Sequence, residues 1–458
     1  MSRLFWGRRL LSLSALLLPL LTSSPAAALQ AEDFTLDNGM RVILVREAKA
    51  PILISEVWYR VGAIDEPAGK GGISHMLEHM MFQGTPAIPA GEFHRRIAQQ
   101  GGEDNAFTSQ DDTCYYIKLA ADRGSLALQL EADRMQHLSL QEASFRSENQ
   151  VVQEERRSRT DADPNARFME RFRAAAFAGH PYGRPIIGSM PEIQQLTTED
   201  LRDWHRRYYA PNNAILVMAG DLDPAQMAQQ VKQAFAAIPA QPAPPRPQLP
   251  ALPESFPEGS RRLEQIDASV TVPLWYGGYP VDSYATGAQK DILALELLAT
   301  ILGGGSNSRL YQRLVRQEGI AVATTAHYGG SARSWELFTL SATPKTESNT
   351  PEIPAASAAL PHMERMILEE VQRLRQQPVS ERELQRAKNS MLAHHVYAHD
   401  SIHELASAIG QLSSNGLSWS ELIESYPERL EAIQASDLQR VAERYLRADR
   451  LTIGVLRP

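Results

Sequence analysis

The sequence predicts an α+β fold in which two domains of similar design are joined by a proline-rich linker. The chain has 458 residues, 43% of them hydrophobic, which is enough for two globular domains of ordinary size. Eight prolines fall within residues 239–258 and exclude regular structure there. On either side of the linker, strand-like and helix-like patterns alternate. The second half repeats the order of elements of the first half in a degenerate form.

The first 28 residues predict a secretory signal. Arg3, Arg8 and Arg9 precede an apolar run at 10–21, and small residues at 25–28 offer a cleavage site. The run is too short for a comfortable membrane span, and a cysteine for a lipid anchor is missing nearby. We therefore expect a mature chain of residues 29–458 in a bacterial periplasm, without a stable membrane anchor. The export route, general or twin-arginine, stays open, and a buried N-terminal helix is the alternative.

Charge and cysteine content narrow the choice of partners. A net charge of −8 argues against nucleic acid or an anionic membrane, since both favour a basic surface. The single cysteine, Cys114, excludes an internal disulfide. Its strand-like surroundings indicate a buried core thiol.

The first domain is expected to span residues 29–238. It opens with a hairpin at 34–46, where Asp37, Asn38 and Gly39 supply the turn. The elements expected after it are strand 52–61, helices 72–83 and 93–100, strands 105–108 and 113–119, helices 126–138, 145–159, 167–177 and 201–208, strand 214–219 and helix 224–238.

The linker is expected at 239–259 and the second domain at 260–458. Helix 291–302 occupies the place of helix 72–83 but carries no histidine, and strand 451–456 mirrors strand 214–219. The other elements expected here are strand 270–279, a turn at 303–308, strands 320–327 and 335–342, and helices 356–376 and 380–412.

Chemistry is concentrated in residues 71–79, which read Gly-Gly-Ile-Ser-His-Met-Leu-Glu-His. On a helix, His75, Glu78 and His79 share one face. Two imidazoles one turn apart can hold a zinc ion, and a carboxylate beside them can take a proton from zinc-bound water. This H-x-x-E-H order is the inverzincin signature. The alternative is a solvated His/Glu face, which the apolar neighbours Met76 and Leu77 oppose.

A zinc site needs a third protein ligand. Helix 145–159 offers Glu148, Glu154 and Glu155, of which Glu148 and Glu155 share a face while Glu154 lies about 100° away. From the residues alone, all three would normally be interpreted as ordinary surface carboxylates.

Taken together, these motifs resemble the pitrilysin/insulinase family of zinc peptidases, and most closely its half-length members related to mitochondrial processing peptidase. Residues 82–85 (Phe-Gln-Gly-Thr) and 101–109 (Gly-Gly-Glu-Asp-Asn-Ala-Phe-Thr-Ser) also fit the family, and Glu155 stands 76 residues after His79, at the family's ligand spacing. The resemblance covers essentially the whole mature chain. It implies two homologous LuxS/MPP-like metallohydrolase domains, one active and one degenerate, each an antiparallel-rich sheet flanked by helices.

The resemblance also implies roles for individual residues. His75, His79 and Glu155 would bind one Zn²⁺ per chain, Glu78 would be the catalytic base, and Glu148 would orient a ligand. An edge strand formed by Asn105, Ala106, Phe107 and Thr108 would pair with an extended substrate, and an ordinary sheet strand is the alternative.

The chain departs from the family in the second domain. Many members carry there an arginine and a tyrosine seven residues apart, which hold substrate and polarise the scissile carbonyl. Alignment puts Val315 and Val322 at these positions, and a shift to Arg316 finds no tyrosine. The resemblance therefore suggests a heterodimer with a metal-less homologous subunit that carries the Arg/Tyr pair, or else a homodimer.

The expected function is zinc-dependent hydrolysis of peptides or unfolded protein segments. The alternative is a catalytically weak, chaperone-like peptide-binding subunit, and a zinc enzyme for a small molecule is a third possibility. A rival metal cluster, His395, His399 and His403, lies at four-residue spacing on helix 380–412. We expect a polar stripe without metal there.

Overall fold

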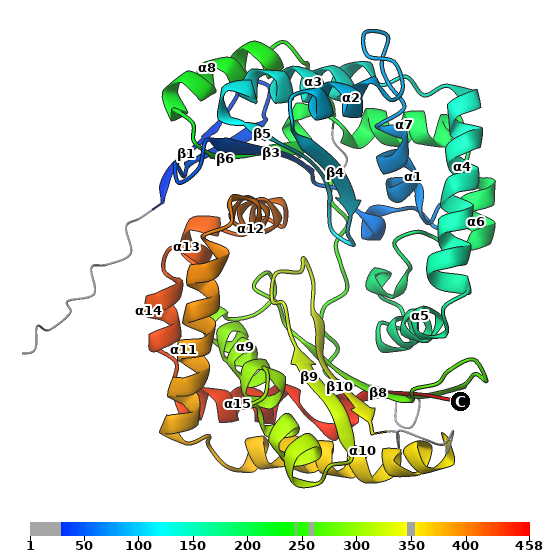
Figure 1. Ribbon diagram of the computed structural model, residues 1–458, viewed down its shortest axis with the longest axis vertical. Coiled ribbons are helices and arrows are strands. Elements are labelled where there is room, and N and C mark those ends of the chain that lie inside the picture. The colour runs from blue at the N-terminus through cyan, green and yellow to red at the C-terminus, as the bar shows by residue number, and fades with distance from the viewer. Residues whose placement is uncertain (1–28, 243–244, 256–260, 346–352) are drawn as a thin grey trace, which may run out of the picture.

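The computed structural model describes residues 29–242, 245–255, 261–345 and 353–458, so the expected signal at 1–28 lies outside the described residues. Figure 1 shows two halves, each built from one sheet and its helices, that face each other across a central space. No helix in the described ranges is both long enough and apolar enough to cross a membrane.

The first sheet has six strands in the order β1-β2-β6-β3-β5-β4. Its pairs are antiparallel except β2 with β6. β4 therefore forms one edge, as the sequence suggested. The strands are β1 (Gln30–Thr35), β2 (Arg41–Arg46), β3 (Ile52–Tyr59), β4 (Glu103–Thr108), β5 (Thr113–Ala120) and β6 (Ala214–Gly220).

The second sheet repeats this topology. Its order is β7-β11-β8-β10-β9, and the parallel pair β7–β11 takes the place of β2–β6. The predicted repeat is confirmed, and β9 is the counterpart of the edge strand β4. The strands are β7 (Arg262–Ile266), β8 (Leu274–Val281), β9 (Ala321–His327), β10 (Glu336–Pro344) and β11 (Thr452–Arg457).

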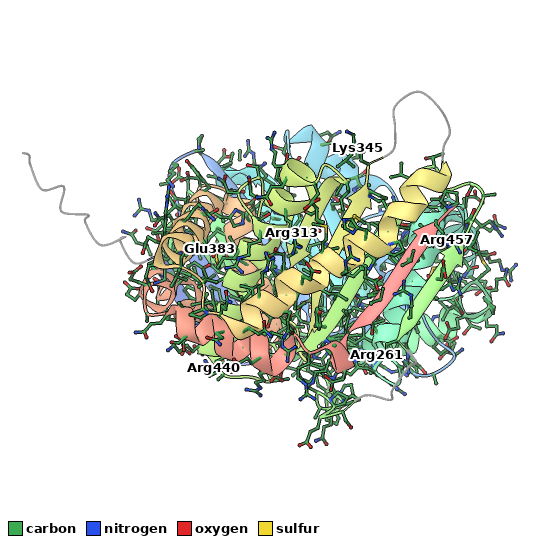
Figure 2. The ribbon with its side chains drawn as sticks, turned by 90° about the horizontal axis from the view of Figure 1, so that it is seen from below. Arg261, Arg313, Lys345, Glu383, Arg440 and Arg457 are labelled. Carbon is green, nitrogen blue, oxygen red and sulfur yellow. The ribbon has the colours of Figure 1, made fainter. Side chains whose placement is uncertain are left out.

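One face of each sheet is covered by helices from the same half of the chain as the sheet itself. Around the first sheet these are α1 (Ile73–Met80), α2 (Glu92–Gln99), α3 (Gly124–His137), α4 (Glu142–Arg156), α6 (Met190–Gln195), α7 (Thr198–Tyr208) and α8 (Pro224–Phe235). Around the second they are α9 (Gln289–Gly303), α10 (Ile353–Gln376), α11 (Glu381–Ala398), α14 (Tyr426–Glu431) and α15 (Ala435–Tyr445). Figure 2 shows α10 running along the outer side of the second sheet, beside the strand β11 that carries Arg457.

The opposite face of each sheet is covered by a helix from the other half. α12 (Ile402–Ser414) and α13 (Trp419–Ile423) pack on the first sheet, where Leu405 and Ile409 meet Trp58 in one buried cluster. In return, α5 (Pro164–Ala176) packs on the second sheet through Phe168 and Phe172. The two halves thus hold each other by exchanged helices (Figure 1).

Sequence and structure differ in several places, and the helices α6, α13, α14 and α15 were not expected from the sequence. The expected helix 380–412 is two helices, α11 and α12, separated at His399–Ser401, because the Ser401 side chain accepts the backbone N–H of Glu404 and starts a new helix. β7 was not expected, and the strand expected at 270–279 begins at Leu274 instead. Cys114 is a buried free thiol, as predicted. The domain limits 238 and 260 stay a prediction.

Candidate metal centre

Helix α1 is fixed at its start by backbone contacts that only glycine permits. Gly72 has a φ of 85°, and a Cβ there would lie 2.3 Å from the Ile187 carbonyl oxygen. The buried Glu66 carboxylate accepts the N–H groups of Gly72 (2.8 Å) and Ser74 (2.9 Å). Met76 and Leu77 are buried in the core. These contacts fix the direction in which the opposite, polar face of α1 points.

The polar face of α1 meets α4 at three nitrogen and oxygen atoms. Glu155 Oε2 lies 3.8 Å from His75 Nε2 and 3.4 Å from His79 Nε2. Among the described residues, these three side chains are the one set that could hold a metal ion, with ligand atoms within 4.8 Å of one another. Tetrahedral zinc ligands at 2.0–2.2 Å lie about 3.3 Å apart, so the two histidines and the carboxylate fit zinc in spacing and in chemistry.

The two histidines differ in their affinity for protons. Burial and the neighbouring His79 lower the pKa of His75 to about 4. Burial also acts to lower the pKa of His79, but hydrogen bonds to Glu148 and Glu155 and the charge of Glu78 raise it to about 9. The hydrogen bond from His79 lowers the pKa of Glu155. His75 is therefore neutral and Glu155 is ionised, and these are the states that metal ligands need. His79 must lose a proton to bind a metal.

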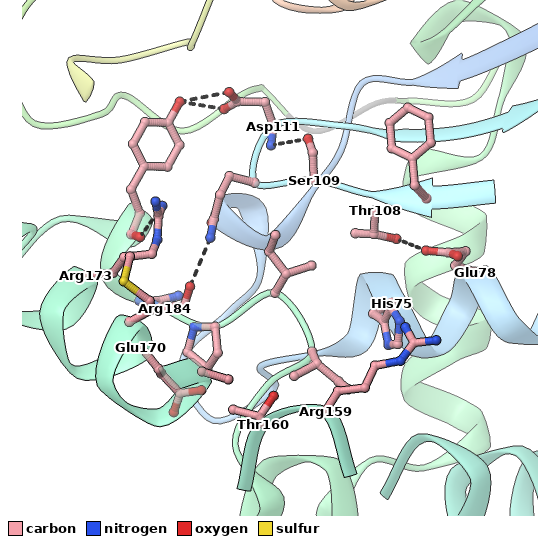
Figure 3. Close-up of a pocket in the computed structure, with 18 of the residues that line it drawn as sticks. His75, Glu78, Thr108, Ser109, Asp111, Arg159, Thr160, Glu170, Arg173 and Arg184 are labelled. Carbon is pink, nitrogen blue, oxygen red and sulfur yellow. Dashed lines mark hydrogen bonds between the residues drawn. The ribbon is translucent and has the colours of Figure 1, made fainter. Parts of the chain in front are cut away.

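Glu78 projects from α1 beside the two histidines. Burial raises the pKa of its carboxyl group, while the hydrogen bond from the Thr108 hydroxyl (2.5 Å to Oε2) lowers it. Figure 3 shows this bond between α1 and the end of β4. Thr108 is thus placed to orient Glu78, a role that the sequence analysis did not give it.

Glu148 lies two turns before Glu155 on α4, behind His79. Its Oε2 is 3.3 Å from His79 Nδ1, and its Oε1 accepts a hydrogen bond from Gln83 Nε2 at 2.9 Å. This leaves His79 Nε2 directed at Glu155. A carboxylate on the far nitrogen of a ligand histidine fixes the ring and its tautomer.

Arg159 extends over the centre from the residues that follow α4. The chain continues there as a π-helical turn, η3 (Arg157–Asp161), and Arg159 Nη1 donates to Glu155 Oε1 at 2.6 Å. In Figure 3 the guanidinium group lies beside His75. The sequence analysis missed this residue, although its i,i+4 spacing from Glu155 was a usable signal.

The centre opens into a cavity of about 1370 Å³ whose lining comes from both halves. One wall holds the histidines, Glu78 and β4, and the other includes Tyr276, His327 and Thr339. On β4, the Ala106 N–H is bonded to the Asn105 side chain at 2.9 Å. Phe107, 38% exposed, contacts Trp58 edge to face.

The structure does not bring Val315 or Val322 to this cavity. Val315 packs against the core of the second half, and neither residue is among those that line the cavity. In the same segment, Arg316 lies over the Tyr311 ring, and Arg313 pairs with Glu369 and Glu370 of α10 (Figure 2).

The rival histidine cluster does not form. His395 and His399 remain neighbours, with His395 stacked on Tyr426. His403 belongs to a different helix, where it contacts Glu56 and Tyr116. The helix break before α12 separates the three side chains.

Comparison with known proteins identifies the family to which the chain is similar. Residues 41–190 match the family model described as insulinase (peptidase family M16), and residues 195–391 match the peptidase M16 inactive domain. The chain is 31% identical to the zinc protease PqqE of Helicobacter pylori over 99% of both chains.

Solved structures that share its fold include two bacterial proteases. A protease from Helicobacter pylori has a TM-score of 0.84 at 30% identity, covering 94% of this chain and all of that one. The periplasmic protease PqqL of Escherichia coli has a TM-score of 0.77 at 20% identity, and this chain covers 93% of its own length but 47% of PqqL. On the length and identity of these similarities, the chain belongs to peptidase family M16.

Proposed function

We propose that this protein is a zinc-dependent endopeptidase that cleaves peptides or unfolded protein segments. The observation that carries the proposal is the convergence of His75, His79 and Glu155 beside Glu78 on the wall of a large cavity. Its relatives that are named zinc proteases support the same chemistry.

The residues would divide the work as follows. His75, His79 and Glu155 would hold one Zn²⁺, which when bound acidifies water and polarises a carbonyl group. Glu78 would accept the proton of the attacking water and pass it to the leaving amine. Glu148 would keep His79 in the orientation that binds metal.

The edge strand β4 is the proposed docking site for substrate backbone. An extended peptide could add to β4 by main-chain hydrogen bonds, with the Ala106 N–H exchanging its bond to Asn105 for one to the peptide. The cavity of about 1370 Å³ exceeds the roughly 300–1000 Å³ of sites for small molecules, which favours a peptide.

The test of the proposal is the variant Glu78→Gln in the mature chain. It should keep one zinc per chain and lose hydrolysis of a quenched unstructured peptide by roughly 10²- to 10⁴-fold, as expected for removal of a general base. Zinc analysis and peptide fluorescence give the two readings. Full activity in this variant would overturn the role of Glu78.

A second candidate function is a peptide-binding subunit with little catalysis of its own. It is favoured by the valines at positions 315 and 322, since neither can polarise a carbonyl group. On this view a metal-less companion chain would supply an Arg/Tyr pair in a heterodimer, whereas a homodimer would lack the pair.

Zinc content and peptide cleavage by the chain alone separate these possibilities. Bound zinc with clear Glu78-dependent cleavage means a self-sufficient peptidase. Bound zinc without cleavage, followed by activity when a metal-less homologous chain is added, means a divided enzyme. Continued inactivity favours the binding subunit.

The proposed place of action is the periplasm. The basic and apolar start of the sequence supports this, as does the description of the fold relative PqqL as a periplasmic protease. Cell fractionation of a tagged full-length chain is the direct check.

A further inference from the structure

The two oxygens of Glu155 have different partners. Oε2 faces the Nε2 atoms of His75 and His79 at 3.8 and 3.4 Å, whereas Oε1 accepts a hydrogen bond from Arg159 at 2.6 Å. The Glu155 side chain is only 15% exposed, so the carboxylate of this ion pair is largely withdrawn from solvent.

The backbone after α4 puts Arg159 where this contact is possible. The α-helical hydrogen bonds give way to a π-helical turn, in which the Ala162 N–H reaches back to the Arg157 carbonyl oxygen at 2.8 Å. Single π-helical turns are frequent at functional sites. Within the described part of the chain, Glu155 is the only hydrogen-bonding partner of the Arg159 side chain, which is otherwise 77% exposed.

Coordination chemistry gives this contact a consequence. A carboxylate can bind a metal through one oxygen or two, and a second oxygen would occupy the position that a catalytic zinc site keeps open. A guanidinium group that holds Oε1 leaves only Oε2 for the metal.

We propose that Arg159 is a positioning residue that restricts Glu155 to binding the metal through one oxygen, an inference that rests on the proposed function. It thereby keeps a coordination position free for water and substrate. The residue acts on the metal centre through Glu155 and not by contact with the reacting atoms.

The experiment compares Arg159→Gln with Arg159→Lys in the mature chain loaded with Co²⁺ in place of zinc. Five-coordinate Co²⁺ absorbs visible light less strongly than four-coordinate Co²⁺. We therefore expect Arg159→Gln to bind one metal per chain with weaker absorption, and Arg159→Lys to recover most of the wild-type spectrum. In any preparation that hydrolyses peptide, kcat should fall by roughly 10- to 100-fold in Arg159→Gln, with little change in KM.

Arg157→Gln is the matched control. Arg157 lies on the same turn but pairs with Glu154 and Gln153, so its loss removes the same charge without touching the ligand. Its spectrum and metal content should equal those of the wild type.

The outcomes separate this inference from the proposed function. A wild-type chain that binds neither Zn²⁺ nor Co²⁺ overturns both. A four-coordinate wild type with an unchanged spectrum in Arg159→Gln overturns the inference alone, whether or not metal affinity falls. Because absorption does not depend on hydrolysis, the test also holds for a chain that needs a companion.

Discussion

At the scale of single residues, Thr108 shows how one position can serve two purposes. Its backbone lies on the edge strand β4, while its hydroxyl group is committed to Glu78. The sequence pattern predicts the strand but not the direction of this side chain, since that depends on how α1 packs behind the sheet. The proposed base, Glu78, is therefore oriented by a hydrogen bond from the same strand that is proposed to bind substrate.

Thr108→Val should lower kcat by roughly 10- to 100-fold, because a hydrogen bond to a charged group is worth about 1.5–3 kcal/mol. Valine keeps the shape and the strand preference of threonine, so stability and zinc content should stay near wild type. Steady-state kinetics on an unstructured peptide measure the effect. Thr108→Ser retains a hydroxyl group and should keep most of the activity, and an equal loss in both variants would argue against the hydrogen bond.

At the scale of elements, local sequence signals were sufficient to predict the helix and the strand that carry the site. The apolar spacing around His75 predicts α1, and the match of residues 101–109 to the family pattern leads us to expect the edge strand β4. Ser401 and Glu404 carry a helix-start signal that would have predicted the break before α12.

Other features depend on contacts between distant residues. The packing of α12 on the first sheet follows from Trp58 and Ile409, which are 351 residues apart, and sequence patterns carry no information on such pairs. The same holds for β7, whose parallel pairing to β11 is nonlocal. For the topological repeat, the sequence predicts the order of elements along the chain but not the order and pairing of strands in the sheets.

Gly410→Ala should reveal how closely α12 packs. A Cβ at Gly410 would lie 2.1 Å from Trp58 Nε1, and Trp58 is fully buried and donates to Glu56. Helix propensity alone predicts a gain of up to about 1 kcal/mol for this change. We expect instead a loss of about 1–3 kcal/mol from overpacking, measured by urea unfolding.

The loss should shrink in a Trp58→Phe background, because phenylalanine lacks the atoms that fill this space. A double-mutant cycle isolates that coupling. If Gly410→Ala stabilised the protein, the close contact between α12 and the first sheet would be wrong.

At the scale of the whole molecule, buried charges connect the two halves. Arg333 of the second half pairs with Asp65 at 2.9 Å, and both side chains are almost fully buried. Nearby, Asp111 accepts a hydrogen bond from the Tyr182 hydroxyl at 2.7 Å and lies 3.3 Å from the Arg333 backbone nitrogen. Burial, with help from the adjacent Asp112, raises the pKa of Asp111 from 3.8 to about 6.

This raised pKa makes stability depend on pH. Below about pH 4 the carboxyl group is protonated in both folded and unfolded chains, and its full contribution is present. As the pH rises through about 6 the folded chain must also release the proton, and up to about 3 kcal/mol of unfolding free energy is lost.

Asp111→Asn should remove this component, while the amide oxygen still accepts the Tyr182 hydroxyl. Urea unfolding of both proteins from pH 4 to pH 7 should show a difference that changes with pH. Asp122→Asn, at an exposed position, is the control and should follow the wild type. Parallel curves for wild type and Asp111→Asn would contradict the assignment.

The exchanged helices also bear on dissection of the protein. A fragment that stopped within the proline-rich segment would lack α12, and Ile43, Ile54 and Trp58 would be left facing water. The complementary fragment would lack α5 and uncover its own sheet around Tyr276. Neither piece would be a finished folding unit, and we expect each to self-associate unless the other is present. The repeat that is visible in the topology is therefore a pair of interdependent partners, suited to reconstitution by coexpression and not to separate study.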